Sequence, residues 1–298
     1  MKKYTIKEFR KQYPDDDACL HKLFEIRYKN LVCPKCENDK PFVRVKDRRS
    51  YYCTCCGFQV YPTKGTIFEK TTTSLTDWFH AIYLQTTTRN GVSAKELERT
   101  FNICYKTALR MAHQIKILMS DKDVPKFFDT VEIDETYIGG QAKFYSNAKR
   151  KKVEKENTKK DNSYGKTQVF GILERGEKGK IYTEVVLDPI NRAWAEDKVK
   201  SMVTFGKQIY TDNSQIYAKL HRLYQHGIVN HIERKWVRGP RHVNTIESFW
   251  NQVKRTIKGT HVHVSNRHMQ KYLNEIAFRW EHRNNQEEMF DLILRRVA

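Results

Sequence analysis

The stretch Val131-Glu-Ile-Asp-Glu-Thr-Tyr-Ile138, followed by Gly139-Gly140, decides the fold class of this 298-residue chain. It is rich in β-formers, and the glycine pair ends it as the end of a strand requires. Downstream, the pattern predicts two strands, a helix, a strand, a helix, a strand and two helices. These elements are expected at 167–173, 180–187, 193–203, 208–211, 215–224, 228–232, 245–258 and 268–283. This order indicates an α/β domain over residues 125–298.

Three smaller segments precede this domain. Residues 1–30 predict a helical lead-in, residues 31–62 hold a cysteine module, and residues 63–124 have a helical pattern. Within the α/β domain, residues 141–166 hold nine Lys or Arg against three acids and few apolar residues. That composition predicts a long basic insertion exposed to solvent.

The composition favours a polyanionic partner. Lys and Arg number 55 against 35 Asp and Glu, which gives a net charge of +20. Such a charge favours DNA or RNA first and an anionic membrane surface second. The sequence contains no stretch with the apolar length of a membrane span and no signal-peptide pattern. We therefore expect a cytoplasmic protein whose cysteines stay reduced.

Five of the seven cysteines fall between residues 33 and 56, and that clustering indicates a metal site. Two C-x2-C pairs, each able to hold an ion from one tight turn, predict a single tetrahedral zinc. Since four thiolates leave no open position, this zinc would be structural. The expected ligands are Cys33, Cys36, Cys53 and Cys56, with Cys55 as a possible competitor. Cys19 and Cys104 are expected to be buried core thiols.

Residues 93–99 and 105–116 predict two helices around a short turn, the pattern of a helix-turn-helix. In the second helix, one face is basic and would meet DNA. Its residues are Lys106, Arg110, His113 and Lys116. An ordinary helix pair with a solvated basic face explains the pattern equally well.

Three acids stand out by their positions. Asp134 lies in the first strand of the α/β domain, Asp212 ends a later strand, and Glu247 lies in a helix. Carboxylates gathered in this way would hold two Mg²⁺ or Mn²⁺ ions for phosphodiester chemistry. Lys254 shares a helix face with Glu247, two turns further along.

Spacing alone does not assemble these acids into a site. Asp212 could cap a helix together with Gln215, and Glu247 could be a surface residue. Either Glu132 or Glu135 could take the place of Asp134.

The chain resembles the insertion-sequence transposases of the IS1595 family, the ISXO2-like group, which is related to the Merlin transposases. The resemblance runs nearly end to end. It rests on the two cysteine pairs, on Gly65-Thr-Ile-Phe-Glu69 and Trp78-Phe-His-Ala-Ile-Tyr83, on Val131 to Gly140, on Thr211-Asp212, and on His242-Val-Asn-Thr-Ile-Glu247-Ser-Phe-Trp250 with Lys254-Arg255.

The resemblance implies an RNase H-like catalytic core with a mixed sheet, preceded by a zinc ribbon and a helical DNA-binding module. It implies an acidic (DDE) triad of Asp134, Asp212 and Glu247, with Lys254 as a DNA contact and Arg255 and Lys258 beside it. Some relatives carry Asn as the third ligand, so Asn244 remains an alternative to Glu247. Glu37 departs from the glycine that usually follows the first cysteine pair.

The implied activity is metal-dependent cleavage at the ends of an insertion sequence and transfer of the freed strand to target DNA. The implied partners are the terminal inverted repeats, target DNA and at least one further copy of the chain, in the bacterial nucleoid. A zinc-ribbon and helix-turn-helix regulator on an inactive nuclease-like scaffold is the main alternative, and a repair nuclease is a minor one.

Overall fold

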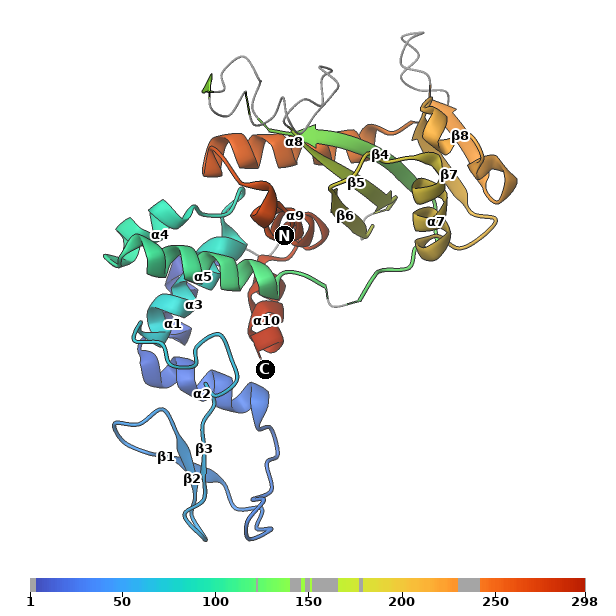
Figure 1. Cartoon of the computed structure of the whole chain (residues 1–298). Helices are drawn as coiled ribbons and strands as arrows, with labels where there is room; N and C mark the ends of the chain where they lie inside the picture. The colour runs from blue at the N-terminus through green and yellow to red at the C-terminus, as the bar shows by residue number, and fades with distance from the viewer. Residues whose placement is uncertain are drawn as a thin grey trace. The chain divides into compact units, whose positions relative to one another are not determined.

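The computed structural model describes residues 4–121, 123–139, 146–147, 151, 166–176, 179–229 and 242–297. Most of the predicted insertion at 141–166 therefore lies outside the described residues. The chain divides into two compact units (Figure 1). One comprises Met1–Met119 together with His282–Ala298, and the other comprises Ser120–Glu281. Among the described helices, none is long and apolar enough to cross a membrane.

The N-terminal unit consists of helices and a small three-stranded sheet. The helices are α1 (Ile6–Gln12), α2 (Asp16–Arg27), α3 (Leu75–Thr87), α4 (Ala94–Phe101), α5 (Tyr105–Leu118) and α10 (Gln286–Val297). The antiparallel strands are β1 (Phe42–Arg44), β2 (Tyr51–Cys53) and β3 (Gln59–Val60). The lead-in forms two helices because Asp15, next to Pro14, accepts a hydrogen bond from the backbone N–H of Ala18 and so begins α2.

The last helix completes the core of the N-terminal unit. Phe290 of α10 lies 5.5 Å from the ring of Tyr4, 5.6 Å from Tyr13 and 6.2 Å from Phe79, between ring centroids. The predicted α/β domain extends to residue 298, whereas the compact unit ends at Glu281. The difference arises because α10 buries its apolar stripe against these aromatic rings.

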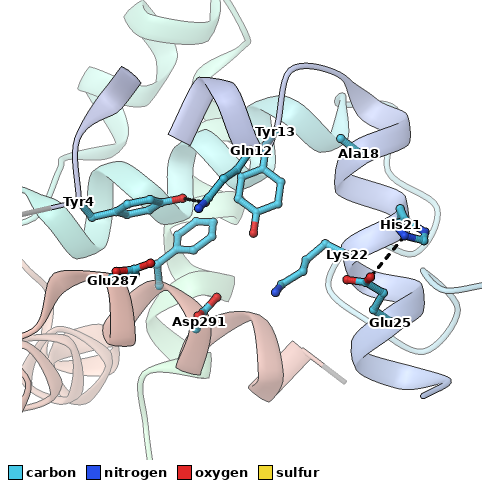
Figure 2. Close-up of a pocket in the computed structure, with 10 residues that line it drawn as sticks. Tyr4, Gln12, Tyr13, Ala18, His21, Lys22, Glu25, Glu287 and Asp291 are labelled. Atoms are coloured by element: carbon cyan, nitrogen blue, oxygen red, sulfur yellow. Dashed lines mark hydrogen bonds and ion pairs between the residues drawn. The ribbon is translucent and has the colours of Figure 1, made fainter. Parts of the chain in front are cut away.

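A cavity of about 320 Å³ lies between α1, α2 and α10 (Figure 2). The Tyr4 hydroxyl donates to Gln12 Oε1 at 2.6 Å on one wall, and His21 Nε2 lies 3.3 Å from Glu25 Oε1 on another. All of its lining residues belong to the N-terminal unit. The cavity therefore shares no residue with the acids singled out in the sequence.

The second unit is built on a five-stranded mixed sheet. Its strands are β4 (Val131–Ile138), β5 (Thr167–Glu174), β6 (Ile181–Val186), β7 (Gln208–Asp212) and β8 (Gln225–Val229). They lie in the order β6-β5-β4-β7-β8. The pairs β6–β5 and β5–β4 are antiparallel, and β4–β7 and β7–β8 are parallel. The predicted strand over 131–138 is confirmed with its bounds.

Helices cover both faces of this sheet. α8 (Asn244–Thr256) and α9 (Asn266–Glu281) pack on one face, where they share a core with Val169 and Tyr210. α7 (Arg192–Met202) packs on the other, where its core includes Val131 and Ile133. Figure 1 shows α8, in orange, running alongside β4. Because alternate residues of a strand face opposite sides, Glu132 and Asp134 point to the α8 face.

Two predicted elements differ from the structure. The helix expected at 215–224 is instead two short 3-10 helices, Gln215–Tyr217 and Leu220–Arg222. Tyr217 ends the first of them and Leu220 begins the second, and both side chains are fully buried in the core on the α7 face. The last strand begins at Gln225, three residues before the predicted start. The end of that prediction, residues 230–232, lies outside the described residues.

The close approach of α8 to the sheet requires a residue without a side chain at Gly171. This residue pairs with Asp134 across β5 and β4. A Cβ placed on Gly171 would lie 2.5 Å from the Trp250 ring and 3.4 Å from Ile246 Cδ1. Since Trp250 is almost fully buried, its ring has little room to move away.

We predict that Gly171→Ala destabilises the second unit by about 1–3 kcal/mol, because the methyl group would force α8 away from the sheet. Gly259→Ala is the matched control, since a Cβ there would meet nothing within 4 Å. Urea unfolding of both variants provides the measurement. A Gly171→Ala protein as stable as Gly259→Ala would contradict the packing described.

Candidate active site and zinc centre

The central strands bring Asp134 and Asp212 to one level of the sheet. β4 and β7 are parallel, with Glu132 paired to Tyr210. Two residues further along each strand come Asp134 and Asp212. Since Tyr210 belongs to the core on the α8 face, both carboxylates point to that face.

α8 adds Glu247 to the same face. Trp250, one turn after Glu247, donates from Nε1 to Asp134 Oδ2 at 3.1 Å and so ties the helix to the strand. Glu247 is half-buried, whereas Asn244 is exposed at the first residue of the helix. This contact of Trp250 was not predicted from the sequence. Its position three residues after an acid on an amphipathic helix was the available signal.

The pKa of Asp134 shows that these acids share one environment. Burial raises the pKa of the Asp134 carboxyl, and the negative charges of Glu135 and Asp212 raise it further, to about 8. The charge of Glu247 acts in the same direction. Besides burial, the negative charges of three neighbouring carboxyl groups therefore act on Asp134, and a bound cation would relieve that repulsion.

Glu135 and Glu132 have other partners. Glu135 points to the α7 face, where its carboxylate accepts from the Tyr217 hydroxyl at 2.5 Å. Burial raises the pKa of Glu135, the Tyr217 hydrogen bond opposes that rise, and the charge of Asp212 contributes to a final value of about 7. The Glu132 side chain is completely buried, and its carboxylate accepts a hydrogen bond from the backbone N–H of Ile246 at the start of α8. Asp134 is thus the acid of β4 that faces Asp212 and Glu247.

Asp212 also forms a turn. Its Oδ1 accepts from the backbone N–H of Ser214 at 3.0 Å, directly before the 3-10 helix at Gln215. Asp212 therefore stabilises the turn after β7 locally. It does so as an Asx turn and not through a capping box with Gln215.

The chemistry of these donors fits a hard divalent cation, because carboxylate oxygens are the ligands that Mg²⁺ and Mn²⁺ prefer. The carboxylate oxygens of these acids are more widely spaced than the Sγ atoms of the cysteine cluster. Within the part of the chain that the structure describes, the only group of three or more potential ligands with atoms within 4.8 Å is formed by cysteines.

That cysteine group has the geometry of a tetrahedral zinc site. All four Sγ atoms of Cys33, Cys36, Cys53 and Cys56 lie within 4.8 Å of one another. Cys33 Sγ is 3.6 Å from Cys56 Sγ, and Cys36 Sγ is 3.7 Å from Cys53 Sγ. A zinc with bonds of about 2.3 Å holds its four sulfurs about 3.8 Å apart. The site therefore fits a structural zinc.

Two similar backbone turns present these thiols. Glu37 N–H donates to Cys33 O at 2.8 Å in the first turn, and Gly57 N–H donates to Cys53 O at 2.9 Å in the second. Glu37 and Gly57 both adopt left-handed backbone conformations, with φ of 54° and 74°. Glu37 thus occupies the position where a glycine would be unstrained.

The remaining cysteines lie outside this group. Cys55 is exposed, so it does not compete as a ligand. Cys19 is buried, as predicted for a core thiol. Cys104 is exposed, so that prediction was wrong. It directly precedes α5, where its thiol lies 3.2 Å from Thr107 Oγ1.

The basic residues predicted to contact DNA are exposed, with one clear exception. On α5, Lys106 and Arg110 are exposed and His113 is half-buried. Lys116 is 1% exposed, so its predicted place on the open basic face is wrong. Lys116 comes one turn after Ala112 and directly after Ile115, so it lies at the edge of the buried apolar stripe of α5. On α8, Lys254 and Arg255 are exposed, as is Lys258 just beyond it.

Comparison with known families identifies both parts of the chain. Residues 126–281 match the ISXO2-like transposase domain, and residues 14–59 match the transposase zinc-ribbon domain. The chain belongs to the ISXO2-like transposase family.

A relative among curated proteins agrees with this membership. The chain is 27% identical over 282 residues to an uncharacterized protein in transposable element ISH50 of Halobacterium salinarum. The match covers 91% of this chain and 92% of that protein. No solved structure matches the chain significantly.

The family boundaries follow the structure closely. The transposase domain ends at residue 281, where the second compact unit ends. The zinc-ribbon domain begins at residue 14 and so includes α2. This helix packs on the ribbon, since Phe24 stacks on Tyr51 with ring centroids 4.0 Å apart and Asp17 pairs with Arg44 at 2.7 Å.

We predict that Cys56→Ser releases zinc and unfolds the ribbon, because a closed thiolate site contributes folding free energy that one missing ligand removes. Cys55→Ser is the matched control and should retain about one zinc per chain. Metal analysis of the purified proteins measures both. A zinc-free parent with a folded N-terminal unit would refute the assignment.

Proposed function

We propose that this member of the ISXO2-like family is an active DNA transposase with a catalytic triad of Asp134, Asp212 and Glu247. These residues would catalyse cleavage at the ends of an insertion sequence and joining of the freed 3′ end to target DNA. One observation carries the proposal. β4, β7 and α8 each direct one acid of the proposed triad to the same face of the sheet, and the pKa of Asp134 is raised by burial and then by the negative charges of its neighbours, Asp212 and Glu247 among them.

The topology supports an RNase H-like core for this unit. Three antiparallel strands are followed across the sheet by two parallel ones, and helices cover both faces. In parallel α/β arrangements, the functional side chains gather at the carboxyl ends of the strands. Asp212 occupies such a position in β7.

Divalent cations held by the triad would activate the attacking oxygen and stabilise the leaving oxygen of the phosphodiester. The chain's own residues would position the groups involved. Trp250 fixes the Asp134 carboxylate through its indole N–H. Lys254, exposed two turns after Glu247 on α8, would contact the phosphates next to the scissile bond.

The N-terminal unit would supply DNA binding. α4 and α5 are joined by the short segment at Asn102, which adopts a left-handed conformation, as a helix-turn-helix requires. Lys106 and Arg110 on α5 would contact DNA phosphates or bases, and the half-buried His113 would lie at the edge of this DNA-binding face. The zinc ribbon would contribute further contacts.

Two element ends must be handled together, so we propose at least a dimer on DNA. Its place of action would be the cytoplasm, where the chromosome lies. A regulator that binds DNA without cleaving it is the competing function, and it predicts specific binding with no metal-dependent nicking.

We predict that Asp134→Ala, Asp212→Ala and Glu247→Ala each abolish strand transfer while leaving binding to end DNA intact, because each removes ligands for the catalytic cations. A Mg²⁺-dependent cleavage and transfer assay on element-end DNA measures this effect. Asn244→Ala is the matched control from the same helix turn and should remain active. If Glu247→Ala keeps its activity and Asn244→Ala loses it, Asn244 and not Glu247 is the third cation ligand.

We further predict that Lys254→Ala weakens binding to end DNA and lowers the slope of log affinity against log salt by about one unit, since one phosphate contact is lost. The difference in DNA affinity between Lys254→Ala and the parent should therefore become smaller as the salt concentration rises. Lys200→Ala removes an exposed charge from α7, on the other face of the sheet, and should leave the slope unchanged. Equal slopes for all three proteins would show that Lys254 only solvates its helix.

A further inference from the structure

Glu132 is a carboxylate in an unusual position. It lies in the central strand β4, two residues before Asp134 and on the same face, and it is 0% exposed. Burying a charged group without partners is strongly unfavourable, so Glu132 must be compensated by specific donors. The identity of those donors indicates what the residue does.

Both carboxylate oxygens of Glu132 are occupied by the start of α8. Oε2 accepts from the backbone N–H groups of Thr245 and Ile246, each at 2.9 Å. Oε1 accepts from the Thr245 hydroxyl at 3.0 Å and from Arg175 Nε at 2.7 Å. With its oxygens engaged in this way, Glu132 acts as an acceptor for the helix and not as a member of the triad.

These contacts replace a missing helix cap. The N-cap residue of α8 is Val243, which makes no side-chain capping hydrogen bond. Thr245 and Ile246 are the second and third residues of the helix, whose N–H groups a capping side chain normally satisfies. Glu132 supplies that acceptor from a neighbouring strand, and its negative charge interacts favourably with the positive end of the helix dipole.

Arg175 connects this cap to the rest of the sheet. Its backbone N–H donates to Thr130 O at 2.8 Å, and its guanidinium lies 4.2 Å from the centre of the Tyr210 ring. The guanidinium also donates to His242 O at 2.5 Å. Arg175 therefore holds Glu132 and the segment leading into α8 against β4 and β7.

The two ties between α8 and β4 lie on either side of Glu247. The Glu132 cap engages residues 245 and 246, and Trp250 bonds to Asp134 three residues beyond Glu247. Together they fix where along the strand, and at what rotation, the helix presents Glu247. We propose that Glu132, held by Arg175, is a positioning residue that sets Glu247 in register with Asp134 and Asp212 for divalent-cation binding.

This inference rests on the proposed function, and its test has readouts besides activity. Full-length parent, Glu132→Gln and Glu275→Gln would be compared. Glu275 is an equally buried carboxylate in α9, paired with Arg279 at 3.3 Å, so its variant controls for the loss of a buried charge in the same unit. The measurements are Mn²⁺ affinity without DNA, melting temperature, and hydrogen exchange of the Thr245 and Ile246 amides.

Glu132→Gln should weaken Mn²⁺ binding by about tenfold or more, because the first turn of α8 would no longer hold Glu247 in register with the other two acids, and it should speed hydrogen exchange of the two amides. High Mn²⁺ should restore part of its cleavage activity. Glu275→Gln should lower the melting temperature while its Mn²⁺ affinity stays within about twofold of the parent, since it leaves the first turn of α8 unchanged. If Glu132→Gln does not fold, the same measurements would be made on Arg175→Lys. This variant removes the guanidinium that holds Glu132 but keeps the Glu132 carboxylate that caps the Thr245 and Ile246 N–H groups.

The results separate two failures. Equal Mn²⁺ affinity in the parent and the Glu132 or Arg175 variant would overturn the positioning role alone. A parent that binds no Mn²⁺ would overturn the proposed function and this inference with it. An Mn²⁺ loss in Glu275→Gln as large as in Glu132→Gln would show that general loosening of the unit is responsible.

Discussion

The bond between the Glu132 carboxylate and the first turn of α8 is the constraint on which the second unit depends. β4 places two acids on one face, two residues apart, and the structure treats them in opposite ways. Glu132 accepts from N–H donors and a guanidinium, whereas Asp134 accepts from the Trp250 indole and lies near the negative charges of other carboxyl groups. The charge of one acid is therefore matched by donors that hold a helix, and its neighbour faces like charges at the point where that helix packs on the strand.

The two units are stabilised by different means. The ribbon has only a few strand residues, and its four thiols replace a core of its own by converging on one point. The sheet unit has apolar layers on both faces and needs no such link. A steric limit adds to the Glu132 contact, because Gly171 leaves just enough space for the Trp250 ring over β5.

Features set by local pattern were predictable from the sequence. β4 is rich in β-forming residues and is followed by glycine, so its bounds were predicted correctly, and the paired cysteines define their own ligand set. Features set by tertiary contacts were not predictable. The burial of Lys116 and the split of residues 215–224 into 3-10 turns depend on packing partners far away in the chain. Glu132 looked like a substitute for Asp134 because sequence spacing does not show what a buried carboxylate bonds to.

The position of α10 has a consequence for how the chain acquires its structure during synthesis. Residues 120–281 are made continuously, so the sheet unit can fold as soon as it leaves the ribosome. The N-terminal unit precedes it in the chain but lacks the Phe290 side of its aromatic core until residues 282–298 emerge. The unit with the zinc ribbon is thus translated before the sheet unit and completed after it, and a chain cut short after residue 281 would contain an entire sheet unit and an unfinished N-terminal unit.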